Sequence, residues 1–148
     1  MTDYRTEAPQ ILRDFLSYHE TIKAHSRRTV DEYFLDLRNF FRYLKRVRNP
    51  ALADLDLDEI DIMDVDLEFV SSVTLTDIYG YMTYLTRDRA QHPNSRNSDY
   101  GLNAASRARK IATIRSFIIT SPTRCTYFVK ILSKISIPPN CAKPCRNT

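Results

Sequence analysis

The stretch S-R-R-T-V-D-E-Y-F-L-D-L-R-N-F-F-R-Y-L at residues 26–44 decides the fold. Its apolar side chains recur every three or four residues, which is the period of an amphipathic helix. These side chains are Val30, Tyr33, Phe34, Leu37, Phe40, Phe41 and Leu44. Ser26 or Thr29 can cap the start of the helix, and Asn49-Pro50 stops it. The stretch therefore predicts one long amphipathic helix.

A second helix is predicted before this stretch, at residues 9–25, with Pro9 suited to its first turn. Its apolar positions at helical spacing are Ile11, Leu12, Phe15, Leu16, Tyr18 and Ile22. A third helix is predicted at residues 74–89, capped by Thr74 or Thr76 and weakened by Gly80 by about 1 kcal/mol relative to alanine. Its predicted apolar face consists of Leu75, Ile78, Tyr79, Met82 and Leu85.

A fourth helix is predicted from Asn103, a plausible N-cap, to about residue 118. Its predicted apolar stripe consists of Ala104, Ala108, Ile111, Ala112, Ile114 and Phe117. Residues 51–74 alternate aspartate with apolar side chains and predict an irregular acidic connector with short turns, whereas residues 91–102 predict a loop. The predicted fold is all-α, with four helices in one domain over residues 1–118.

The net charge of +4 over 148 residues conceals two basic blocks around an acidic one. Residues 1–50 carry a net charge of +3, residues 51–74 carry −8, residues 103–119 carry +4 and residues 120–148 carry +5. Basic blocks are the usual electrostatic footprint of a protein that binds polyanions. We therefore take nucleic acid as the first partner to consider, with an acidic loop that repels DNA and helps to orient the domain.

Several other functions find little support in the composition. Two glycines leave no material for a glycine-rich phosphate loop, and no apolar run approaches the roughly 18 residues of a membrane span. His25 and Arg28 form an H-x-x-R string without convergent partners, so we interpret His25 as a helix-terminus residue and His19 and His92 as surface residues. The acidic stretch lacks the spacing of an EF-hand, and three cysteines without a nearby histidine do not form a zinc motif. No cofactor, metal or small-molecule substrate is expected, and the protein is expected to be cytoplasmic.

The basic positions fall at the starts of two predicted helices, where backbone N–H groups, hydroxyls and cations can hold phosphate together. The candidate DNA-binding residues are Ser26, Arg27, Arg28, Thr29, Ser106, Arg107, Arg109, Lys110, Thr113 and Arg115. The alternative is that these charges only solvate exposed helix faces. In that case the chain would be a helical protein-interaction module whose acidic loop binds a partner.

Residues 26–44 resemble the Ser/Thr-x-x-Thr-x-x-x-Tyr-x-x-Asp-Leu-x-x-Phe-x-x-Phe/Tyr-Leu pattern of the core-binding domain of tyrosine recombinases of the phage integrase and Xer type. Residues 104–117 are similar to the last helix of that domain, whose Arg-x-x-x-x-(Leu/Ile)-Arg-Ser-Phe ending matches five positions. These positions are Arg109, Ile114, Arg115, Ser116 and Phe117. Together the two matches cover about residues 8–118.

The resemblance implies a SAM-like bundle of four helices, one half of a clamp that contacts a recombination half-site on double-stranded DNA beside other recombinase protomers. Chemistry in that family belongs to a separate domain with arginines, a lysine, histidines and the nucleophilic tyrosine. We therefore expect that the chain is not itself an enzyme and does not cleave DNA alone. The parent could act in chromosome dimer resolution, a form of chromosome partition, in phage integration or in mobile-element movement.

Residues 119–148 differ in composition from the rest of the chain, with all three cysteines, four of the seven prolines and no acidic residue. If codons restart at the third base of each codon from Ser121 onward, one choice of synonymous bases reads PNKVHVLRENPVKDLDSPKLRKTLPKYL. That string resembles the family's linker, which contains Glu-Asn-Pro. The tail is therefore expected to be a frameshifted linker, disordered or loosely docked, and the coding DNA would test this reading.

Overall fold

The computed structural model describes residues 3–87 and 104–120, which are helical and contain no strand. The helices are α1 (Tyr4–Glu7), α2 (Gln10–Thr21), α3 (Arg27–Arg48), α4 (Leu67–Ser71), α5 (Leu75–Arg87) and α6 (Ala104–Thr120), with two 3₁₀ turns, η1 (Pro50–Leu52) and η2 (Leu57–Glu59). The all-α prediction is confirmed, and α1 and α4 add two short helices to the four expected. The predicted loop at 91–102, with His92, and residues 121–148 of the tail lie outside the described residues.

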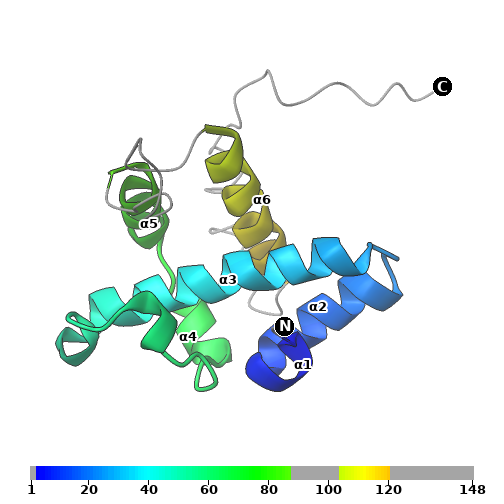
Figure 1. Ribbon diagram of the computed structural model, residues 1–148, viewed down its shortest axis with the longest axis horizontal. Helices are drawn as coiled ribbons and strands as arrows, with labels where there is room; N and C mark the ends of the chain where they lie inside the picture. Colours follow the sequence, from blue (N-terminus) through cyan, green and yellow to red (C-terminus); the bar gives the residue numbers. More distant parts are fainter. Residues whose placement is uncertain (1–2, 88–103, 121–148) are drawn as a thin grey trace, which may run out of the picture.

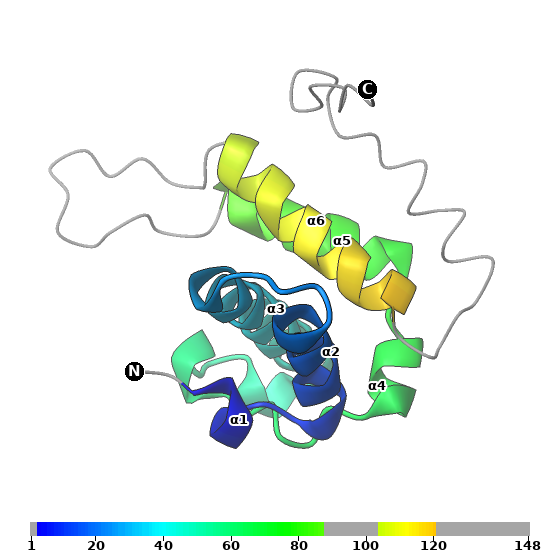
Figure 2. The same ribbon diagram turned by 90° about the vertical axis from the view of Figure 1, so that its right-hand side faces the viewer.

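The long helix α3 organises the fold, because it contacts α2, α5, α6 and both 3₁₀ turns. It crosses the molecule with α5 and α6 on one side and α1, α2 and α4 on the other (Figure 1). Figure 2 shows α5 and α6 side by side as a layer over the hairpin of α2 and α3. Helix α6 therefore packs against α3 within the same bundle.

Helix α3 begins where its sequence predicts. Ser26 is the N-cap, and its hydroxyl accepts a hydrogen bond from the Thr29 backbone N–H at 3.3 Å. The predicted apolar face is buried apart from Tyr33, which is partly buried against the core. The face also contains Asp36, whose side chain is almost completely buried. A carboxylate in this position requires hydrogen-bonding partners on a neighbouring helix.

Aromatic side chains fill the space between the layers. The Phe117 ring of α6 meets Phe15 of α2 at 5.2 Å and Phe41 of α3 at 5.7 Å between ring centroids, both edge to face. Phe40 of α3 packs in the same manner against Tyr81 of α5 at 5.2 Å. Aromatic pairs at these distances and angles stabilise a core in addition to the stabilisation that comes from burying their apolar surface. Phe117 thus joins α6 to both helices of the hairpin.

The acidic connector is irregular with short turns, as predicted, but it is more than a solvated loop. Its apolar side chains enter the core, and they are Ile60, Ile62, Val65, Val70 and Val73. The short helix α4 forms there because the Asp66 carboxylate caps it by accepting from the Phe69 N–H at 2.8 Å. Asp58 pairs with Arg42 at 3.1 Å, and Asp64 pairs with Lys45. Two of the acidic side chains therefore attach the connector to α3 through ion pairs.

Helix α5 starts with a reciprocal cap, since the Asp77 N–H donates to the Thr74 hydroxyl and the Thr74 N–H donates to the Asp77 carboxylate. Thr74 is therefore the cap, rather than Thr76. The buried residues of α5 are Ile78, Tyr81 and Leu85. Tyr79, predicted for this face, is 54% exposed. A Cβ atom added to Gly80 would lie 3.0 Å from the Tyr43 hydroxyl, so glycine allows the close approach of α3 and α5.

The predicted apolar stripe of α6 is rotated relative to the observed buried face. The buried residues of α6 are Lys110, Thr113, Ile114, Phe117 and Ile118, whereas Ala104 and Ala112 are exposed. Only Ile114 and Phe117 were predicted correctly. The physical reason is Asp36, because its buried carboxylate takes two polar side chains of α6 into the interior.

Candidate nucleic-acid interface

The structure brings together the two basic segments that the sequence singled out. Arg28, in the first turn of α3, has a side chain that is 90% exposed and lies 3.6 Å from Glu32. The other oxygen of the Glu32 carboxylate lies 3.3 Å from Arg109 of α6. Glu32 therefore connects two arginines that are 81 positions apart in sequence order, as the numbers of the two residues show. The start of α3 and the N-terminal half of α6 form one surface, which we name the α3–α6 face.

Beneath this face, the Asp36 carboxylate holds the two helices together. The Lys110 ammonium donates to it at 2.6 Å, and the Thr113 hydroxyl donates to its other oxygen at 3.3 Å. Arg109 approaches the same carboxylate at 3.3 Å from the solvent side. Buried charges are retained in proteins when they are paired and hydrogen-bonded in this way. The carboxylate accordingly anchors α6 on α3.

Lys110 and Thr113 do not have the exposed positions expected of them. The Lys110 side chain is 7% exposed and Thr113 is buried, and both face α3 rather than solvent. Sequence reasoning did not identify Asp36 as their partner. The sequence does signal that Asp36 is buried, because it stands at helical spacing from Tyr33 and Phe40 on an otherwise apolar face, but this spacing does not name its partners.

The structure places the remaining candidates in different surroundings. Arg107 and Arg115 are partly exposed, and Arg107 donates to the Thr86 hydroxyl of α5 at 2.6 Å. Ser106 is also partly exposed. Ser26 and Thr29 share a hydroxyl hydrogen bond of 2.9 Å at the start of α3. Arg27 lines a small polar pocket beside α1, whose other charged members are Asp3, Arg5, Glu20 and Asp31.

The surface position expected for His19 is wrong. The imidazole is 6% exposed and lies among the rings of Phe15, Tyr33 and His25, with centroid distances of 4.4, 5.4 and 5.1 Å. Neither ring nitrogen has a hydrogen-bond partner among the described residues. Burial lowers the pKa of His19 below its ordinary value of 6.5, and the neighbouring His25 and Lys23 lower it further. His25 precedes the cap of α3, as expected of a helix-terminus residue.

This environment makes the stability of the fold dependent on pH. Because folding lowers the pKa of His19, the unfolded chain binds this proton more readily than the folded protein does. The free energy of unfolding should therefore fall as the pH drops through the unfolded value of about 6.5, until the folded pKa is passed. Urea unfolding at about pH 7.5 and about pH 5 measures the change in the free energy of unfolding, and the His19→Phe variant serves as the comparison. Equal pH dependence in the two proteins would contradict the assignment to His19.

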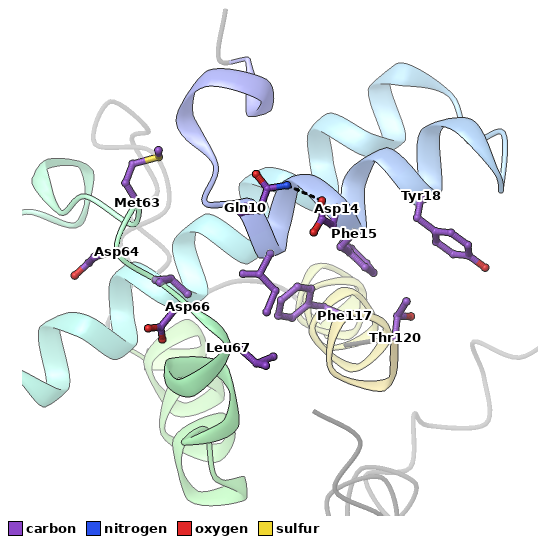
Figure 3. A pocket seen from close by; sticks show the side chains of 12 residues that line it. Gln10, Asp14, Phe15, Tyr18, Met63, Asp64, Asp66, Leu67, Phe117 and Thr120 are labelled. Atoms are coloured by element: carbon purple, nitrogen blue, oxygen red, sulfur yellow. Dashed lines mark hydrogen bonds between the residues drawn. The ribbon is translucent and has the colours of Figure 1, made fainter. Parts of the chain in front are cut away.

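A pocket of about 630 Å³ opens between α2, the acidic connector and the end of α6 (Figure 3). Apolar side chains line it, among them Ile11, Phe15, Leu67 and Phe117. Its polar members include the carboxylates of Asp14, Asp64 and Asp66, and none of the described residues that line it is a lysine or an arginine. This charge is unfavourable for a polyanion, so the pocket is not part of the proposed DNA surface.

Two absences characterise the described ranges, 3–87 and 104–120. Within them, no helix combines the length and apolar character needed to cross a membrane. The same ranges hold no group of three or more histidine, cysteine, aspartate or glutamate side chains placed to bind a metal ion.

Comparison with known proteins identifies the relationship. Over 109 residues, the chain is 42% identical to "Tyrosine recombinase XerC" of Caldanaerobacter subterraneus subsp. tengcongensis. The chain is related to the tyrosine recombinases. The match covers 74% of this chain but only 28% of the length of that relative.

This tyrosine recombinase homology confirms the resemblance read from residues 26–44 and 104–117, and the helical structure fits an N-terminal domain of such a recombinase. No protein-family model and no solved structure matches the chain.

Proposed function

We propose that this domain is the DNA-binding, core-binding part of a site-specific tyrosine recombinase and that it contacts double-stranded DNA through the α3–α6 face. The observation that carries the proposal is the meeting of Arg28 and Arg109 at Glu32, because it joins the two basic segments into one surface. The relationship to a tyrosine recombinase supports DNA as the partner.

The chemistry of the face suits the DNA backbone. The free backbone N–H groups at the start of α3, together with the hydroxyls of Ser26 and Thr29, form an environment that favours a phosphate. Arg28 adds an exposed cation on this helix, and Arg107 and Arg109 add two on α6. Contacts of this kind position a protein on a duplex without reading its sequence. Lys110 and Thr113 act from beneath, by holding α6 at the angle that the contacts require.

The strand-cleaving chemistry is proposed to lie outside residues 3–87 and 104–120, so that these residues supply binding and orientation. Other recombinase protomers on the same DNA and a cytoplasmic location complete the proposal. The relationship to a tyrosine recombinase supports both proposals, and this relationship covers the 28% of that protein that the chain matches.

The double substitution Arg28→Ala/Arg107→Ala tests the proposal on the full chain. It removes one cation from each helix without touching Asp36, and we expect duplex binding at low salt to weaken about tenfold or more. Fluorescence anisotropy with a labelled duplex measures the affinity. Arg46→Ala is the control for loss of charge, because Arg46 lies near the other end of α3, where it stacks on Tyr84. Equal losses in the control and in the double variant would reject the α3–α6 face.

A second candidate function is favoured by the pocket between α2 and α6. Its apolar lining and its carboxylates suit a basic, amphipathic helix of a protein partner. Binding of that kind would depend on Leu67 and Ile11 rather than on Arg28 and Arg107. Leu67→Glu would abolish it and leave DNA binding unchanged, so this substitution separates the two functions.

A further inference from the structure

Glu32 is an acidic side chain that lies between two arginines of the α3–α6 face. Its side chain is 39% exposed, and its two carboxylate oxygens face Arg28 at 3.6 Å and Arg109 at 3.3 Å. These are two of the three arginines that we place at the DNA backbone. A phosphate that approached either guanidinium would meet the negative charge of Glu32.

The fold does not depend on this carboxylate in the way that it depends on Asp36. Asp36 is buried and is satisfied by Lys110 and Thr113 from α6. Among the described residues, the ion pairs of Glu32 are exposed ones, which contribute little to stability and exchange readily for other partners. The two acidic residues on the same helix therefore have different roles. Asp36 anchors α6, whereas Glu32 forms ion pairs with Arg28 and Arg109 at the surface.

We infer that Glu32 competes with DNA phosphate for Arg28 and Arg109 and thereby limits the affinity for DNA. The inference rests on the proposed function. A phosphate must displace the carboxylate from the arginines, so binding to an arbitrary duplex is weakened. A correct site can recover this loss through additional contacts, because phosphate contacts are common to every sequence and base contacts are not. Glu32 thus lowers the affinity for non-specific DNA without removing the cations that a specific complex uses.

Glu32→Gln in the full chain is the direct test, with a random-sequence duplex as the probe. Removing the charge while keeping the size of the side chain should tighten non-specific binding about tenfold at low salt, and the gain should shrink as salt rises. Glu68→Gln is the matched control, because Glu68 is an exposed glutamate on α4 and its loss changes the net charge equally. The control should tighten binding less than about twofold, since a distant charge is screened.

A double-mutant cycle separates local competition from a general effect of charge. In the Arg28→Ala/Arg109→Ala background, Glu32→Gln should change the affinity less than about twofold, because the cations that the carboxylate occupied are gone. An undiminished gain in that background would overturn the inference, and so would equal gains for Glu32→Gln and Glu68→Gln. The urea midpoint of Glu32→Gln should match that of the unaltered chain, and a large decrease would show that Glu32 is structural instead.

The outcomes also separate this inference from the proposed function. If the unaltered chain binds duplex DNA with strong salt dependence and Glu32→Gln behaves like Glu68→Gln, the inference alone fails. If neither the unaltered chain nor Glu32→Gln binds DNA at low salt, the proposed function fails and the inference fails with it.

Discussion

Replacing Asp36 with alanine is expected to lower the free energy of unfolding by about 3–5 kcal/mol, the largest effect of any single polar substitution considered for this fold. The carboxylate is buried and accepts from Lys110 at 2.6 Å and from Thr113 at 3.3 Å. Its removal leaves the Lys110 ammonium in the interior without its counter-charge. Urea unfolding at neutral pH, followed by circular dichroism, measures the loss.

Two comparisons show whether this loss comes from the buried charge. The double variant Asp36→Leu/Lys110→Met replaces the pair with apolar side chains and should recover most of the stability, because buried ion pairs are often no more stabilising than well-packed apolar residues. Asp58→Asn removes a carboxylate that is 92% exposed and pairs with Arg42, so it should cost less than about 1 kcal/mol. A loss in Asp36→Ala no larger than that in Asp58→Asn would contradict the anchoring role.

Phe117→Ala is expected to destabilise the fold by about 3–5 kcal/mol. The ring is 2% exposed, and it packs edge to face against Phe15 of α2 and Phe41 of α3. Its loss leaves a cavity where α6 meets the hairpin, and the pocket beside it would enlarge. Thermal and urea unfolding of the variant measure the effect.

Tyr79→Ala provides the matched comparison, because this aromatic side chain on α5 is 54% exposed. It should change the free energy of unfolding by less than about 1 kcal/mol. The fold described above would be contradicted if Phe117→Ala were as mild as Tyr79→Ala, since α6 would then not depend on its aromatic anchor.

The sequence predicts the hairpin of α2 and α3 well because its apolar residues follow the helical period without interruption. Val30, Leu37 and Leu44 are buried as expected, and Ser26 caps α3. The short helices α1 and α4 are missed, because four or five residues contain too little of the period to be recognised. Both depend on tertiary contacts and on caps, Asp3 and Asp66, which resemble ordinary loop residues in the sequence.

The face of α6 could not be predicted because the rule that apolar residues are buried fails there. Lys110 and Thr113 are inside, and alanines are outside. The rotation depends on a single charge on another helix, 74 residues earlier in the chain. Periodicity within one helix carries no information about such a partner.

The candidate interface is predictable in part. The basic blocks mark the start of α3 and the N-terminal half of α6, and the structure places Arg28 and Arg109 on one surface. The roles of individual residues are not predictable from charge alone. Lys110 is a buried anchor, Arg27 lines a pocket with charges of both signs, and Glu32 lies between two cations. Each of these assignments depends on a neighbour that only the three-dimensional arrangement supplies.

The measurement that tests the central claim most directly is the salt dependence of duplex binding by the full chain. If Arg28, Arg107 and Arg109 contact phosphates, the logarithm of the association constant should fall linearly with the logarithm of the salt concentration, with a slope of about −0.9 for each contact. The slope should therefore be close to −3 for the unaltered chain and should be reduced by about two units in Arg28→Ala/Arg107→Ala. An affinity that does not respond to salt, or no binding at low salt, would contradict DNA-backbone recognition by the α3–α6 face.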